Sequence, residues 1–290
     1  MMSVRDGAVS ENRWGLGQHT QAAIRKGHDE YMTQTQDLSA TTRKLEGKTA
    51  VVAAGAKNLG GLVSRQLAAL GANVAVHYNS DSSRTDAEKT AAAVEEQGGK
   101  AVVVQGDLTV PATVTALFDA AVGAFGGVDI AVNTVGKVLR KPIAETTEAE
   151  YDSMFDINAK AAYFFLQEAG KRVNDNGTVI SIVTSLLAAY TDGYSTYAGG
   201  KAPVEHFTRA ASKEFADRGI SVNSIGPGPM DTPFFYPQET PERVEFHKSQ
   251  AMGNRLTDIN DIAPIVTFLA TDGHWITGQT IFANGGYTTR

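Results

Sequence analysis

The chain contains no cysteine among its 290 residues. It can therefore form no disulfide, and it offers neither a thiolate nucleophile nor a thiolate metal site. It also lacks an apolar run long enough to cross a bilayer, and polar residues such as Arg5 and Glu11 stand where a signal peptide would be apolar. These absences predict a cytoplasmic protein with no membrane-spanning part.

Positive charge is not in excess either. The formal net charge is −6 and no block of Lys and Arg concentrates charge, so the composition argues against a nucleic-acid partner. The histidines show no ligand spacing such as His-Glu-x-x-His, and no Gly-x-Ser-x-Gly elbow is present, so we expect neither a metal site nor nucleophilic hydrolysis. Surface or packing roles are expected for His19, His28, His77, His206, His247 and His274.

Large apolar side chains are scarce in residues 1–44. A helix-like piece at 19–32 has only Ile24, Tyr31 and Met32 as anchors. Such a segment buries too little surface to fold alone. It is either a flexible tail or an arm that docks on its own domain or on a neighbouring subunit. Residues 45–290 are expected to form a single domain.

From residue 48 onward, short apolar runs alternate with segments of helical periodicity. Strand followed by helix, repeated about six times, is typical of a parallel sheet with helices on both faces. The sequence therefore predicts an α/β protein with a doubly wound, Rossmann-type parallel sheet. The expected strands are 49–54, 73–78, 101–105, 128–132, 178–183 and 220–225, and the expected helices are 59–70, 85–97, one after Pro111, 151–171 and 196–217.

The first strand-to-helix turn, residues 54–61, is rich in glycine. Glycine lets the backbone pass close to a pyrophosphate, which the exposed amides of a helix N-terminus attract. The turn lacks the early pair of Gly-x-Gly-x-x-Gly, and taken alone it is explained nearly as well by a plain tight turn. Its place on the first strand of a doubly wound pattern favours a dinucleotide site.

Tyr197 and Lys201 are four residues apart in an expected helix. They therefore share a face on which an ammonium can bias a phenol toward losing its proton, although such a pair is by itself a common surface pattern. Ser185 follows the strand 178–183, so Ser185 and Tyr197 can converge on one substrate oxygen. There the phenol could neutralise the charge that a hydride leaves on a carbonyl oxygen. The adjacent Thr184 also carries a hydroxyl, and both residues fit.

The chain from about residue 45 to the end resembles the short-chain dehydrogenase/reductase family. Gly55 and Gly61 match the glycine turn of that family, while Ala54 and Leu59 depart from it. The remaining matches occur in the family's order and at its spacing, which makes the set specific. They are Asp107, the segment 133–136, Asn158, Pro227 and Gly228 with Thr232, the segments 278–279 and 284–286, and the pair Tyr197 and Lys201.

The resemblance implies a role for each catalytic candidate. Tyr197 would be the general acid in carbonyl reduction and the general base in alcohol oxidation. Lys201 would lower the pKa of Tyr197 and bind the nicotinamide ribose, and Asn158 would anchor a relay water. Ser185 would hold the reacting oxygen, and it is preferred to Thr184 because it aligns with the second of the family's paired serines. The expected cofactor-binding residues are Gly55, Lys57, Asn58, Leu59, Gly60, Tyr78, Asn79, Ser80, Asp107, Leu108, Asn133, Gly136, Tyr197, Lys201, Pro227, Gly228 and Thr232.

The end of the second strand bears on which dinucleotide binds. An acidic side chain there would bond the ribose 2′-hydroxyl of NAD and repel the 2′-phosphate of NADP. Tyr78 occupies that place, followed by Asn79 and Ser80, which could bond a phosphate, while Lys57 and Arg84 offer positive charge. The sequence thus favours NADP, with NAD as the alternative.

Aromatic residues mark the expected substrate side. Phe234, Phe235 and Tyr236 suggest an apolar lid, and with Tyr190 and Tyr194 they favour a small ketone or aldehyde with an apolar or ring-containing body. The function expected is NADP(H)-dependent carbonyl reduction. An NAD-dependent alcohol dehydrogenase and a non-catalytic dinucleotide-binding regulator are the alternatives. The family resemblance also implies a homodimer or homotetramer.

Overall fold

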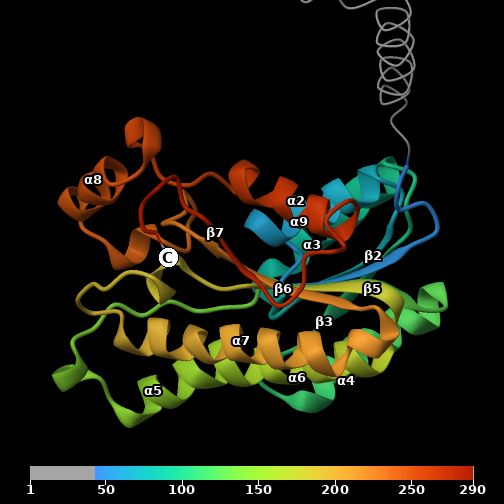
Figure 1. Cartoon of the computed structure of the whole chain (residues 1–290), viewed down its shortest axis with the longest axis horizontal. Helices are drawn as coiled ribbons and strands as arrows, with labels where there is room; N and C mark the ends of the chain where they lie inside the picture. Colours follow the sequence, from blue (N-terminus) through green and yellow to red (C-terminus); the bar gives the residue numbers. More distant parts are fainter. Residues whose placement is uncertain (1–42, 290) are drawn as a thin grey trace, which may run out of the picture. The chain divides into compact units, whose positions relative to one another are not determined.

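The structure is a computed structural model that describes residues 43–289 (Figure 1). Its centre is a seven-stranded sheet of order β3-β2-β1-β4-β5-β6-β7, and every neighbouring pair is parallel. The strands are β1 (Thr49–Ala53), β2 (Asn73–Tyr78), β3 (Ala101–Gln105), β4 (Val128–Asn133), β5 (Val173–Ile182), β6 (Ser221–Pro227) and β7 (Thr280–Ala283). The predicted doubly wound, Rossmann-type α/β fold is confirmed.

Helices cover both faces of the sheet (Figure 1). One layer holds α2 (Asn58–Ala69), α3 (Arg84–Glu96) and α9 (Ile259–Ala270). The other holds α4 (Pro111–Phe125), α5 (Glu148–Phe155), α6 (Ala161–Arg172) and α7 (Ser195–Glu214). The strands are apolar on both sides for this reason: Val52 packs with Leu67 in the first core, and its neighbour Val51 packs with Phe118 in the second.

The predicted helix 151–171 is interrupted in the structure. A π-helical turn, Asp156–Lys160, separates α5 from α6, and Asn158 lies in it, fully buried. The Asn158 side chain donates to the Met154 carbonyl at 3.0 Å and to the Lys137 carbonyl at 2.8 Å. Single π-turns are frequent at functional sites, and composition alone does not distinguish them from regular helix.

The N-terminal boundary lies close to the predicted one. The compact unit begins at Arg43, and Lys44 forms an ion pair with Asp272 at 2.5 Å. The expectation of a tail or docking arm falls on residues 1–42, outside the described residues. Between residues 43 and 289, no helix is both long and apolar enough to span a membrane. The cytoplasmic location stays a prediction.

Candidate active site

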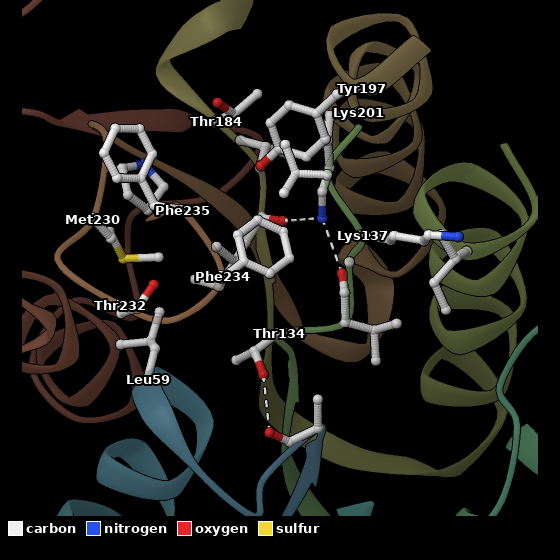
Figure 2. Close-up of a pocket in the computed structure, with 18 of the residues that line it drawn as sticks. Leu59, Thr134, Lys137, Thr184, Tyr197, Lys201, Met230, Thr232, Phe234 and Phe235 are labelled. Carbon is white, nitrogen blue, oxygen red and sulfur yellow. Dashed lines mark hydrogen bonds between the residues drawn. The ribbon is translucent and has the colours of Figure 1, made fainter. Parts of the chain in front are cut away.

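A cavity of about 970 Å³ opens where the parallel strands end. Its wall combines the β1–α2 turn, the ends of β4 and β5, the first turns of α7, and the segment that leads to α8 (Pro241–Ser249). Figure 2 shows side chains from these distant parts of the chain facing one space. In open parallel sheets this edge is where ligands bind, as the sequence led us to expect.

The β1–α2 turn is held in a strained, compact form. Ala54 and Asn58 have φ values of +56° and +49°, and a Cβ at Gly60 would lie 2.2 Å from the Ala54 carbonyl oxygen. Ser64 donates to the Gly60 carbonyl at 2.9 Å, and Thr134 donates to the Ala53 carbonyl at 2.8 Å. The Thr134 hydroxyl also lies 3.4 Å from the Ala54 carbonyl oxygen (Figure 2). Asn58, Leu59 and Gly60 therefore bring the N-terminus of α2 to the cavity, where its free amides can face an anion.

His77 supports this turn from β2, a role that sequence reasoning missed. Its imidazole is 2% exposed, Nδ1 accepts from the Ala54 amide at 3.0 Å, and Nε2 lies 2.8 Å from the Gly106 carbonyl oxygen. Burial lowers the pKa of His77, consistent with a neutral ring that accepts at Nδ1 and donates at Nε2. In the sequence, the only sign of this supporting role is that a histidine interrupts an otherwise apolar strand. Asp107 and Leu108 follow Gly106 and line the cavity as predicted.

The residues proposed to select the dinucleotide occupy different positions. Asn79 and Lys57 line the cavity, whereas Tyr78 and Ser80 do not. Tyr78 is buried, with its hydroxyl donating to Gln105 at 3.2 Å. Arg84 lies over the Tyr78 ring at 5.8 Å from its centroid.

The positive charges near the end of β2 have acidic partners. Arg84 donates to Asp81 at 2.9 Å, and Lys57 lies 3.5 Å from Asp86. Both cations are about half exposed, so these pairs are weak and leave them available to a phosphate.

Lys201 lines the cavity, and backbone carbonyls at the ends of two strands hold its side chain in place. Its ammonium donates to the carbonyls of Val135 and Ile182, each at 2.9 Å (Figure 2). Burial lowers the pKa of Lys201 to about 8. A Cβ at Gly136 would lie 3.0 Å from the Lys201 Nζ, so the glycine keeps that approach open.

Tyr197 lies one helical turn before Lys201 on α7, and its phenol faces the cavity. Burial raises the pKa of Tyr197 to about 12, and a hydrogen bond with the Thr184 side chain opposes that rise. The direction is opposite to the lowering expected from Lys201, because burial of the phenol is the largest influence on its pKa. Tyr197 is accordingly a protonated phenol at neutral pH.

Two hydroxyls follow β5, and both belong to residues that line the cavity. The Thr184 Oγ1 accepts from the Leu186 amide at 3.3 Å, and the Thr184 side chain acts on Tyr197 by lowering the pKa of its phenol. Ser185 lines the cavity as well and is 1% exposed. Figure 2 shows the Thr184 side chain beside Tyr197.

The remaining predicted site residues divide into two groups. Gly136, Pro227, Gly228 and Thr232 line the cavity with those already named. Gly55, Tyr78, Ser80, Asn133 and Asn158 do not, and of these only Ser80 is exposed.

Some of these residues support the wall from behind. The Asn133 side chain accepts from the Val135 amide at 3.0 Å, and that of Asn158 accepts from the Lys137 amide at 3.2 Å. Thr232 differs from them, because its Oγ1 is buried and has no hydrogen-bond partner in the described part of the chain.

The expected apolar lid is formed by part of the aromatic set. Phe234 and Phe235 line the cavity, and the Phe234 ring lies 6.3 Å from the Tyr197 ring. Tyr194 lies at the same ring separation from Tyr197 and also faces the cavity. Tyr236 donates to Asp231 at 2.6 Å outside the cavity, and Tyr190 is fully exposed. Sequence reasoning missed Met230, Glu239, His247 and Tyr287 as lining residues.

Across the described residues, no group of three or more His, Asp or Glu side chains could hold a metal ion. The fold and the cavity define a Rossmann-type α/β protein with a phenol and an ammonium buried beside a helix N-terminus. A family model described as enoyl-(acyl carrier protein) reductase matches residues 53–288. The chain belongs to the short-chain dehydrogenase/reductase family of oxidoreductases.

Named relatives agree with this assignment. An NADPH-dependent aldehyde reductase-like protein of Arabidopsis thaliana is 33% identical to this chain. The match covers 88% of this chain and the full length of the Arabidopsis protein. A short-chain type dehydrogenase/reductase of Picea abies is 34% identical, and the match covers 83% of this chain and 93% of the Picea protein. The solved structure of a Burkholderia cenocepacia dehydrogenase with bound NADP is 55% identical, covers 89% of this chain and 99% of that one, and superposes with a TM-score of 0.84.

Proposed function

We propose that this protein is an NADP(H)-dependent oxidoreductase that reduces a ketone or aldehyde with an apolar body, with Tyr197 as the general acid. The observation that carries the proposal is the buried Tyr197 phenol, which shares one cavity with Lys201 and with the preformed N-terminus of α2. The similar dehydrogenase that holds NADP and the relative named as an NADPH-dependent aldehyde reductase-like protein support the choice of cofactor.

The residues present fit a dinucleotide. The free amides at the start of α2 would hold the pyrophosphate, and Asp107 would meet the adenine end. Lys57 and Asn79 would face the 2′-phosphate, with Arg84 close by in sequence. At the other end, the unpaired Thr232 hydroxyl offers a hydrogen bond to the nicotinamide carboxamide.

The bound cofactor would supply a hydride to the carbonyl carbon. Tyr197 then donates its proton to the oxygen on which negative charge develops. The phenol holds its proton at neutral pH, as a general acid must. With its pKa lowered to about 8, the Lys201 side chain is still mostly protonated at neutral pH, so it adds positive charge to the site.

We assign the positioning of the substrate oxygen to Thr184, because its side chain lowers the pKa of the Tyr197 phenol, which Ser185 does not do. Ser185, the residue predicted from the sequence, is the alternative. Asn158 would act through the backbone of Lys137, which it holds from both sides, and the relay water expected there stays a prediction.

Oxidation of NADPH and NADH, measured at equal concentration with a panel of aromatic ketones, aldehydes and quinones, tests this function. Turnover with a clear preference for NADPH is the expected result. Tight NADPH binding without turnover across the panel would support a dinucleotide-binding regulator, and a clear preference for NADH would overturn the cofactor assignment. The homodimer or homotetramer stays a prediction that sedimentation at micromolar concentration can test.

A further inference from the structure

Four polar side chains form a connected cluster in the substrate side of the cavity wall: Tyr194, Glu239, His247 and Tyr287, here called the Glu239 cluster. The Glu239 side chain is fully buried. Its Oε1 accepts from the Tyr194 hydroxyl and lies 3.0 Å from His247 Nε2. The Tyr287 hydroxyl lies 3.0 Å from His247 Nδ1. Residues more than ninety positions apart are thereby joined in one hydrogen-bonded chain.

The direction of each hydrogen bond in the cluster follows from charge. Arg243 donates to Glu239 Oε2 at 2.9 Å, and Arg140 lies 3.9 Å from the same oxygen. A carboxylate held by two guanidinium groups only accepts, so His247 must carry its proton on Nε2. In the tautomer that carries its proton on Nε2, Nδ1 is the acceptor of the Tyr287 hydroxyl.

The two phenols keep their protons. Burial, together with Glu239, raises the pKa of Tyr194, and burial raises the pKa of Tyr287. Each phenol directs its single O–H inward, Tyr194 to Glu239 and Tyr287 to His247. Tyr194 and Tyr287 line the cavity, whereas Arg140 and Arg243 do not. Because each O–H is engaged inside the cluster, a phenol oxygen that meets a ligand can only accept a hydrogen bond from it.

The geometry points to a subsite that accepts a hydrogen bond from a hydroxyl group of the substrate. This inference rests on the proposed carbonyl reduction and narrows its substrate class to ketones and aldehydes that carry a hydroxyl on their apolar body. Phe234, Phe235 and Met230 would contact the carbon skeleton, since they line the same part of the cavity. A methoxy or carboxylate group has no O–H to donate, so it could not form this hydrogen bond with the phenol oxygens.

Matched ketones test the subsite: 6-hydroxy-1-tetralone, 6-methoxy-1-tetralone and unsubstituted 1-tetralone, with the 7-substituted pair to vary the hydroxyl position. For the wild-type protein, we expect kcat/KM for a hydroxylated probe to exceed that of both comparators by about five- to tenfold, the size of one net hydrogen bond. In the double variant Tyr194→Phe with Tyr287→Phe, the ratio should fall close to one. Tyr190→Phe is the matched control, because Tyr190 is fully exposed, and it should keep the ratio.

Equal kcat/KM across the series in the wild type, or a preference that survives in the double variant, overturns the subsite. If no probe is reduced, the proposed function is in question, and the subsite is then judged by binding alone. Calorimetric titration of the hydroxy, methoxy and unsubstituted tetralones into the NADPH-saturated protein should again favour the hydroxylated probe. Equal affinities in that titration would reject the subsite whether or not the protein turns over a substrate.

Discussion

The two halves of the cavity are built by different means. The half proposed to hold the nucleotide, here called the nucleotide half, consists largely of backbone: the ends of β1 and β4, the compact turn before α2 and its amides. The half proposed to hold the substrate, here called the substrate half, consists of side chains from the loop after β5, from α8 and from the C-terminal segment, joined through Glu239. In the proposed function, the first half would suit any dinucleotide of this geometry and the second would select the carbonyl compound.

A bulky residue in the turn should break the nucleotide half alone. In Gly60→Val, the added side chain collides with the Ala54 carbonyl oxygen, which lies 2.2 Å from the position of a Cβ. We expect NADPH affinity, measured by fluorescence titration, to fall by about 100-fold or more, since backbone displacement removes several hydrogen bonds to the phosphates. Gly123→Val is the control, because a Cβ at Gly123 meets nothing within 4 Å. Unchanged affinity in Gly60→Val would reject the preformed turn.

Variants of the two hydroxyl residues after β5, Thr184 and Ser185, test the place where the two halves of the cavity meet. Thr184→Ala removes the partner of Tyr197 and should lower kcat by about 100-fold, as loss of one oxyanion donor does. Ser185→Ala should lower kcat by much less, and Thr184→Ser should restore most of the activity. Near-normal turnover in Thr184→Ala with loss in Ser185→Ala would return the role to Ser185.

Removing the buried carboxylate should loosen the substrate half alone. Glu239→Ala leaves Arg243 and His247 without their shared partner, so we expect unfolding free energy to fall by about 3–5 kcal/mol, as for other broken buried pairs. Substrate KM should rise while NADPH affinity stays near the wild-type value. Glu242→Ala, on an exposed position of α8, is the control for both measurements. A loss of NADPH affinity equal to the rise in KM would mean that the halves are not independent.

A pH dependence of stability is expected from Lys201, which lies at the junction of the two halves. Its pKa is lowered from 10.5 to about 8, so between these values the unfolded chain binds a proton that the folded chain does not. Stability should therefore rise with pH in this window, by about 3 kcal/mol in total from this group. Urea unfolding at pH 8, 9 and 10 should show the rise in the wild type and its loss in Lys201→Met. Parallel profiles for the two proteins would refute the lowered pKa.

The nucleotide half could be predicted from the sequence because it follows local rules. Apolar runs predict the first six strands, with the start of β5 five residues later than in the structure, while β7 is not among the expected strands. Gly60 and Asp107, expected from the family resemblance, and Tyr197 and Lys201, expected from their helical spacing, line the cavity. The π-turn at Asn158 escaped prediction because its residues have ordinary helical composition.

The substrate half could not be predicted in the same way. Glu239, His247 and Tyr287 come together only through tertiary structure, and α8 carries little apolar periodicity that would indicate which side faces the cavity. The role of His77 was hidden for a related reason, since its partners at Ala54 and Gly106 are distant in sequence.

The central claim is that a proton from Tyr197 completes a reduction by NADPH, and the variant Tyr197→Phe tests it most directly. Its kcat, measured with saturating NADPH and the best ketone of the panel, should fall by about 10²- to 10⁴-fold, the usual contribution of a general acid. NADPH affinity, measured in the same preparation, should change far less, because the dinucleotide is held mainly by backbone. A kcat close to that of the wild type would contradict the account.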